Sequence, residues 1–325
     1  MMDNKIYFQI KAFFLVLSLK YLFTINYITN ASIENKIKIS VSYSTDNNYI
    51  YPTIVSMKSL IANAGYNTFY YIYILHTPDF TENSKQFLKT LEKKYFYKCS
   101  IIFFDMGNKY KGLQLSFKLK TPAYYRLSLQ DILPKVERII YLDGDTLVFE
   151  DLKDLFELDM KGNVILGFLD SIPDAIKAFG FKNATVICSG VLLIDLNGLR
   201  KYNYSKKIAD FISHYKKNLT QHDQTIINVV MQERIGPIPP KFGVWEAWKN
   251  KIETKKYLDK YKHRLRYNED ELNYAIRHPA IVHFTRLKPF WKKHTAFYNE
   301  WWRYARLTGY YDIIYSKSPN PNKKK

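Results

Sequence analysis

Segments typical of strands alternate with segments typical of helices through the first half of this chain. Apolar or alternating runs typical of strands occupy residues 37–43, 69–75, 100–104 and 138–142. Apolar residues at helical spacing lie between them, from Pro52 to Gly65 and over residues 82–94. This order predicts an α/β domain with a mainly parallel central sheet flanked by helices, in which ligands bind at the carboxyl ends of the strands.

The second half of the chain continues this pattern and then departs from it. Helical apolar spacing recurs over residues 121–133 and 205–217, and strand-like runs over 164–169 and 190–196. No β-alternation is evident after Val282. We expect three parts: an apolar N-terminal segment (1–35), a main domain (36–295) and a helical C-terminal tail (296–325) rich in basic and aromatic residues.

The composition is that of a globular and strongly basic protein. Hydrophobic residues make up 47% of the sequence, and 49 Lys and Arg against 30 Asp and Glu give a net charge of +19. Such a charge attracts nucleic acid, anionic lipid or phosphorylated substrates. Because no Cys/His zinc framework or RNA-recognition signature occurs, we do not expect nucleic acid as a partner. Cys99 and Cys188 share no metal or redox spacing, which favours a reducing compartment.

Residues 6–28 are apolar and aromatic but contain Lys11 and Lys20. A membrane-spanning helix needs about 20 mostly apolar residues, so the two lysines argue against a clean span. Three interpretations stay open: a signal peptide cleaved near Ala31, an extended start, or a segment at a membrane interface. We expect a cytoplasmic protein held peripherally at the inner face of the membrane, with an N-terminal anchor or signal as the open alternative.

Two carboxylates follow directly on the strand expected at residues 138–142. Asp143-Gly144-Asp145 falls in the turn at its carboxyl end, where Gly144 keeps a side chain from crowding a metal. A hard cation such as Mn2+ or Mg2+ prefers such oxygen ligands and can bind both phosphates of a nucleotide-sugar. An isolated Asp-x-Asp arises by chance about once in such a chain, so its place after a buried strand is what favours a metal site.

Six segments of the sequence occur in an order known from one protein family. They are residues 44–49 (STDNNY), 121–127 (TPAYYRL), 141–148 (YLDGDTLV), 189–196 (SGVLLIDL), 223–228 (DQTIIN) and 283–289 (HFTRLKP). Together they resemble family 8 glycosyltransferases, which include bacterial lipopolysaccharide sugar transferases and relatives of glycogenin. The resemblance implies a GT-A fold and a retaining hexosyltransferase. It would move glucose or galactose from a UDP-sugar donor to a glycan or glycolipid acceptor such as lipopolysaccharide.

The resemblance also implies a metal shell. His283 would complete the ligand set of Asp143 and Asp145, and Lys288 would neutralise the leaving diphosphate. A purely structural histidine at the end of a strand is the alternative.

On the donor side, the resemblance implies roles for Asp46, Asn48, Tyr49 and Arg126. A carboxylate and an amide suit the edge of a uracil ring, and a guanidinium binds phosphate or sugar oxygens in a forked geometry. The alternatives are an Asx turn at Asp46, loop packing by Tyr49 and a surface salt bridge at Arg126.

On the sugar side, the resemblance implies that Asp170 and Asp223 hold hydroxyls of the transferred sugar and that Gln224 lies beneath the anomeric carbon. Retention requires either a nucleophile on the opposite face or attack by the acceptor on the same face. Because an amide is a poor nucleophile, we favour same-face attack, in which the leaving phosphate takes the proton of the acceptor.

Two positions depart from the family pattern. Cys188 stands where Asn commonly precedes Ser-Gly-Val, and Arg286-Leu287 stand where Gly is common. Cys188 leaves open a second function, a sugar-nucleotide or glycan-binding protein with little turnover. The basic aromatic tail is expected at a membrane surface, with a solvated helical tail as the alternative.

Overall fold

The first strand forms where the sequence alternates. In this computed structural model, which describes residues 33–113, 121–170, 179–181, 184–215, 222–245, 267–293 and 295–318, β1 (Ile37–Thr45) runs parallel to β2 (Thr68–His76) along its whole length. β3 (Cys99–Asp105) extends the sheet beyond β2, and β4 (Arg138–Leu142) lies on the other side of β1. Four parallel strands therefore share one carboxyl edge.

Beyond β4, one strand reverses the direction of the sheet. β7 (Ile187–Asp195) is antiparallel to β4 and to β6 (Ile165–Leu169), and β8 (Ile235–Pro237) runs parallel to β6 at the edge. The order is β3-β2-β1-β4-β7-β6-β8. The expected mainly parallel sheet is confirmed. The direction of β7 had no signature in the sequence, because a strand buried on both faces is apolar whichever way it runs.

A second, three-stranded sheet was not expected from the sequence. It has the order β5-β10-β9 and contains β5 (Thr146–Val148), β10 (Ile281–His283) and β9 (Val244–Trp245). Strands of two or three residues are too short to display a period. This small sheet nevertheless ties the turn after β4 to the C-terminal part of the domain.

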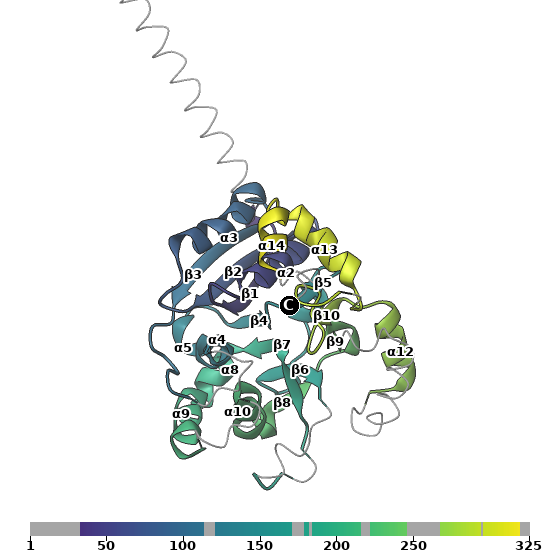
Figure 1. Cartoon of the computed structure of the whole chain (residues 1–325). Coiled ribbons are helices and arrows are strands. Elements are labelled where there is room, and N and C mark those ends of the chain that lie inside the picture. Colours follow the sequence, from purple (N-terminus) through teal and green to yellow (C-terminus); the bar gives the residue numbers. More distant parts are fainter. Residues whose placement is uncertain are drawn as a thin grey trace, which may run out of the picture.

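Helices cover the sheet on both sides (Figure 1). α2 (Ile50–Ala62), α3 (Glu82–Lys94), α13 (Tyr298–Leu307) and α14 (Tyr311–Lys317) gather on one side. α3 has the bounds predicted from its spacing, because Thr81 accepts a hydrogen bond from the Ser84 N–H and caps its first turn.

The helix expected over residues 121–133 is broken into three short turns. These are α4 (Pro122–Tyr125), η1 (Arg126–Ser128) and α5 (Leu129–Ile132). Near them lie α8 (Leu196–Lys201), α9 (Tyr204–Tyr215) and α10 (His222–Val230) (Figure 1). The remaining described helices are α6 (Lys153–Phe156), η2 (Gln232–Arg234), η3 (Pro240–Phe242) and α12 (Glu269–Arg277).

The described part of the C-terminal tail packs onto the domain. Trp301 and Trp302 are buried, and the Asn63 side-chain amide of α2's C-terminal end donates to the Tyr304 hydroxyl at 2.7 Å. These tryptophans of α13 are therefore core residues, whereas Leu307 of α13 and Ile313 of α14 are exposed. Among the described residues, no helix combines the length and apolar composition needed to cross a bilayer. The apolar segment before residue 33 and the final lysines lie outside the described residues.

Candidate metal centre and active site

The turn after β4 holds two carboxylates at the carboxyl edge of the sheet. The Thr146 N–H donates to the Asp143 carbonyl at 3.1 Å and closes the turn, while the Asp143 N–H donates to the Gly190 carbonyl of β7 at 2.8 Å. Gly144 is required because a Cβ there would lie 2.4 Å from Thr53 Oγ1. The space that this glycine leaves is taken by Thr53 of helix α2. That Gly144 also keeps a side chain away from a metal stays a prediction.

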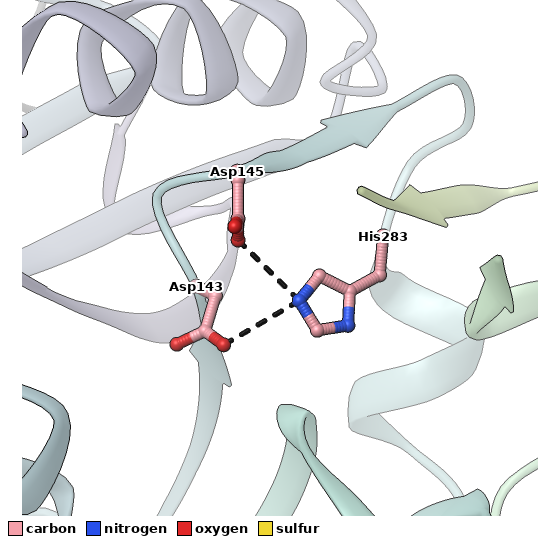
Figure 2. A group of neighbouring side chains, drawn as sticks. All are labelled: Asp143, Asp145 and His283. Atoms are coloured by element: carbon pink, nitrogen blue, oxygen red, sulfur yellow. Dashed lines mark ion pairs between the residues drawn. The ribbon is translucent and has the colours of Figure 1, made fainter. Parts of the chain in front are cut away.

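The register of the small sheet brings a distant histidine to this turn. His283 pairs with Thr146, the residue after Asp145, and the Phe284 N–H donates to the Asp145 carbonyl at 3.0 Å. His283 Nε2 lies 3.3 Å from Asp145 Oδ1 and 3.5 Å from Asp143 Oδ2 (Figure 2). One ligand atom from each of the three side chains lies within 4.8 Å of the others. The three residues proposed as metal ligands thus converge.

The charges around Asp145 fit a bound divalent cation. Its buried Oδ1 has no hydrogen-bond partner of normal geometry among the described residues, while Oδ2 accepts from the Tyr49 hydroxyl at 2.7 Å and from the Lys288 ammonium. Burial alone would raise the pKa of Asp145, but Lys288 and His283 hold it well below its usual range. Two ionised carboxylates and an imidazole provide the oxygen and nitrogen donors that such cations accept.

The same two carboxylates also shift the pKa of His283. Burial would lower its pKa, yet the close contacts of Nε2 with the Asp143 and Asp145 carboxylates raise it well above the ordinary value. For Asp143, burial raises the pKa, but Arg126 and His283 reverse this and leave it below its usual range.

Arg126 lies inside the site and not on the surface. Its NH2 is 2.7 Å from Asp143 Oδ1 and its Nε is 3.2 Å from Asp223 Oδ2. The guanidinium carbon lies 4.1 Å from the centre of the Tyr141 ring, and NH1 donates to the Ser189 carbonyl. The surface salt bridge considered as an alternative is therefore wrong, because Arg126 is buried. Its contact with the donor stays a prediction.

The three residues proposed for the sugar side reach the same edge. Gln224 Nε2 donates to Asp170 Oδ2 at 2.8 Å, and its Oε1 accepts from the Ser189 N–H at 3.1 Å. Its amide is held from both ends. Burial raises the pKa of Asp223, and the Arg126 guanidinium offsets this only in part.

The loop after β1 contains an Asx turn at Asp46, one of the two interpretations of this loop. Asp46 Oδ1 accepts from the N–H groups of Asn48 at 2.8 Å and Tyr49 at 2.7 Å. Tyr49 does more than pack the loop, because its hydroxyl reaches Asp145 and its ring centre lies 5.6 Å from that of Trp291. Asn48 is exposed. Base recognition by Asp46 and Asn48 stays a prediction.

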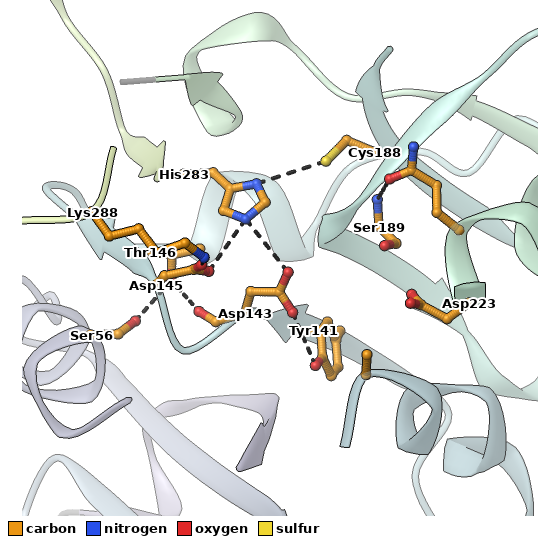
Figure 3. A network of polar contacts seen from close by, with 12 residues as sticks. Ser56, Tyr141, Asp143, Asp145, Thr146, Cys188, Ser189, Asp223, His283 and Lys288 are labelled. Carbon is orange, nitrogen blue, oxygen red and sulfur yellow. Dashed lines mark hydrogen bonds and ion pairs between the residues drawn. The ribbon is translucent and has the colours of Figure 1, made fainter. Parts of the chain in front are cut away.

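Residues given no role from the sequence complete the centre (Figure 3). Cys188 Sγ lies 3.7 Å from His283 Nδ1, and a Cβ on Gly190 would lie 2.1 Å from His283 Cε1. The sequence signal for the contact at Gly190 was a glycine inside a strand, because such a glycine marks the close approach of another group. Tyr141 gave no signal, since an aromatic residue in an apolar run is expected to pack in the core.

Most of the sequence matches a known protein family. Residues 40–295 match the family model described as glycosyl transferase family 8. General stress protein A of Bacillus subtilis is 26% identical over 276 residues, which are 81% of this chain and 91% of that protein. Lipopolysaccharide 1,2-glucosyltransferase of Escherichia coli is 24% identical over 302 residues, covering 88% of this chain and 80% of that protein.

Solved structures share the fold at lower identity. The bifunctional glycosyltransferase WbbM has a TM-score of 0.70 at 18% identity; the match covers 86% of this chain but only 52% of WbbM, so this chain spans about half of that protein. The galactosyltransferase LgtC, in complex with donor and acceptor sugar analogs, has a TM-score of 0.67 at 19% identity, covering 83% of this chain and 95% of LgtC. These likenesses confirm the GT-A fold. Because the family model matches most of its length, this chain belongs to glycosyl transferase family 8 and is a glycosyltransferase.

Proposed function

We propose that this glycosyltransferase moves a hexose, glucose or galactose, from a UDP-sugar to a glycan or glycolipid acceptor, with retention at the anomeric carbon. The observation that carries this proposal is the convergence of Asp143, Asp145 and His283 beside Lys288 at the carboxyl edge of the sheet. The names of two similar proteins support it. One is a lipopolysaccharide 1,2-glucosyltransferase, and the other was solved with donor and acceptor sugar analogs.

Asp143, Asp145 and His283 would hold Mn2+ or Mg2+. When bound, this cation supplies positive charge for the donor diphosphate. Lys288, which donates to Asp145 and to the Tyr49 hydroxyl at 3.0 Å, is placed to bring a second positive charge to the same diphosphate as the sugar leaves.

The remaining proposed donor contacts come from the loop after β1, from the turn at Gly144 and from Arg126. Asp46, Asn48 and Tyr49 would hold the uracil. Gly144 keeps α2 close to the turn between the carboxylates. The buried guanidinium of Arg126 fixes Asp143 and Asp223 together, and it can offer its remaining N–H groups to a donor oxygen.

Retention is proposed to follow from same-face attack by the acceptor. Both ends of the Gln224 amide bind protein groups, Asp170 and the Ser189 N–H, which suits an orienting group and not a nucleophile. Asp170 and Asp223 would bind sugar hydroxyls. The leaving phosphate would take the acceptor proton, so the contribution of the protein is positioning and charge stabilisation.

A membrane contact through the C-terminal helices is part of the proposal. Since the two tryptophans of α13 are buried, we assign the contact to Leu307, Ile313 and Tyr315, which are exposed on α13 and α14, together with the lysines of the tail. Such a contact would hold the enzyme at the inner face of the membrane, close to a glycolipid acceptor.

A donor screen tests the proposed function. The full-length protein would be incubated with UDP-glucose, UDP-galactose and their N-acetyl forms, with and without Mn2+, and released UDP would be followed by mass spectrometry. We expect Mn2+-dependent consumption of one hexose donor. Binding of UDP in calorimetry without consumption of any donor would instead indicate a sugar-nucleotide-binding protein.

A further inference from the structure

The imidazole of His283 is held on three sides. On one side Nε2 faces Asp143 and Asp145, and on the opposite side Nδ1 lies 3.7 Å from Cys188 Sγ (Figure 3). Gly190 underlies the ring so closely that its missing Cβ would overlap Cε1, Nδ1 and Nε2. Cys188 and Gly190 are two residues apart on β7, in a stretch where its register with β6 shifts, and both approach the ring.

The two ring nitrogens of a metal-binding histidine differ in protonation. An imidazole binds a cation through a nitrogen that carries no proton, so the other nitrogen must carry one and needs an acceptor. Here Nε2 points to the carboxylates, which leaves Nδ1–H to find a partner. Among the described residues, the contact recorded for Nδ1 is the sulfur of Cys188.

A thiol is an unusual partner for this position. Its sulfur is a weak hydrogen-bond acceptor, whereas carboxylates, backbone carbonyls and water are the common partners of metal-binding histidines. The Cys188 side chain is buried, and the His283 ring lies directly against the backbone of Gly190. Contact with one weak acceptor inside a tight slot can therefore still fix the orientation of the ring.

We propose that Cys188 is a positioning residue for His283: its sulfur accepts the Nδ1–H, which keeps Nε2 directed at the cation held with Asp143 and Asp145. This inference rests on the proposed metal site. It also gives a role to the cysteine that stands where asparagine is common in the family. Cysteine in place of asparagine at this position would then change the hydrogen-bond partner of His283 without implying a loss of activity.

Binding of Mn2+ alone to the full-length protein tests this role. Free Mn2+ would be measured by electron paramagnetic resonance during titration, in the absence of nucleotide. We expect Cys188→Ala to weaken Mn2+ binding by about 10-fold or more, as loss of an outer hydrogen-bond partner does at other metal sites. We expect Cys188→Ser to retain most of the affinity, because a hydroxyl also accepts a hydrogen bond.

Cys99→Ala is the matched control. Cys99 is also buried, but it lies at the start of β3 and its sulfur contacts the Tyr95 carbonyl, far along the sheet from the metal centre. We expect this variant to bind Mn2+ like the wild type, even if its thermal stability falls as much as that of Cys188→Ala. In an assay with a donor that the wild-type enzyme consumes, Cys188→Ala should need a higher Mn2+ concentration to reach its half-maximal rate. Its kcat at saturating Mn2+ should equal that of the wild type.

Two results would overturn the inference. The first is wild-type Mn2+ affinity in Cys188→Ala, and the second is equal loss in the Ala and Ser variants, which would indicate a packing role. If the wild-type protein bound no Mn2+ at all, the proposed function would fail and this inference with it. If the wild-type protein bound Mn2+ and Cys188→Ala bound it equally well, the role of Cys188 would be refuted while the proposed function stood.

Discussion

At the scale of single residues, Asp145 is where the charges of the site meet. One carboxylate oxygen faces His283, and the other accepts from Tyr49 and Lys288. The residue is only 5% exposed, so these partners and not water balance the charge of its carboxylate. A neutral residue here would remove one of the two carboxylates that face His283 and the carboxylate that accepts from Lys288, in addition to removing a metal ligand.

We expect Asp145→Asn to reduce donor turnover by at least ~100-fold, because a neutral amide cannot replace a carboxylate ligand at the charge-bearing centre. Its unfolding free energy without metal should fall by roughly 1–3 kcal/mol. Donor hydrolysis and urea denaturation measure the two effects. Asp154→Asn, an exposed carboxylate on α6, is the control and should change neither. Near-normal turnover by Asp145→Asn in Mn2+ would refute the site.

At the scale of elements, the contact between β7 and α10 sets the sugar side of the site. The Asn228 side chain accepts from the Ile187 N–H at 2.8 Å and donates to the Ile187 carbonyl at 2.8 Å. This pair joins the helix to the start of the strand. It therefore fixes the distance between Gln224 on α10 and Ser189 on β7, whose hydrogen bond orients the amide.

We expect Asn228→Ala to lower the unfolding free energy by about 2–4 kcal/mol, because it leaves the N–H and the carbonyl of a buried strand unpaired. We also expect kcat to fall more than the KM for the donor rises, since the orientation of Gln224 is lost. Urea denaturation and steady-state kinetics measure these effects. Asn197→Ala, exposed on α8, should cost less than about 0.5 kcal/mol. Equal stability of the two variants would contradict this account.

The C-terminal helices combine two roles that truncation can separate. Ile314 of α14 is fully buried, and the Tyr310 hydroxyl lies 2.7 Å from Thr90 Oγ1 of α3. We expect removal of all residues after Tyr310 to lower the melting temperature by several degrees, through lost apolar burial. Removal of residues 319–325 should leave the melting temperature unchanged and weaken binding to anionic vesicles, because it removes lysines. Unchanged vesicle binding by the shorter truncation would count against a membrane role for these lysines.

At the scale of the whole molecule, buried tyrosines link stability to alkaline pH. Burial raises the pKa of Tyr110 to about 12 and that of Tyr125 to about 12, and it also raises the pKa values of Tyr43 and Tyr70. A group whose folded pKa lies above its unfolded value of about 10 stabilises the fold fully below pH ~10. That contribution is lost as the pH rises from ~10 toward the folded values, because the unfolded chain ionises first.

We expect the melting temperature to fall by roughly 10 °C or more between about pH 9 and pH 11.5. Calorimetry or circular dichroism across this range measures the effect. Tyr43→Phe should reduce the alkaline loss, whereas Tyr66→Phe, at a residue that is 92% exposed, should retain the wild-type profile. A flat profile in the wild type would show that these hydroxyls do not control stability.

Much of the large sheet could be predicted from the sequence, because strands and helices with clear periods are local features. The period of α3 gave its bounds, and the run before Asp143 gave β4. The small sheet was missed, since β5, β9 and β10 are too short to show a period. The helix expected over residues 121–133 is interrupted by the turn that begins at Arg126, whose guanidinium contacts two carboxylates.

The sequence by itself determined the order of elements, the family, and the residue types at the metal centre, since these depend on local spacing and on motifs that are read in one dimension. Only the tertiary structure decided that Arg126 is buried between Asp143 and Asp223, that Gly144 makes room for Thr53, and that Cys188 meets His283. These are contacts between strands and helices far apart in the chain. Their distances follow from strand register and from packing across the sheet, which no local pattern of residues encodes.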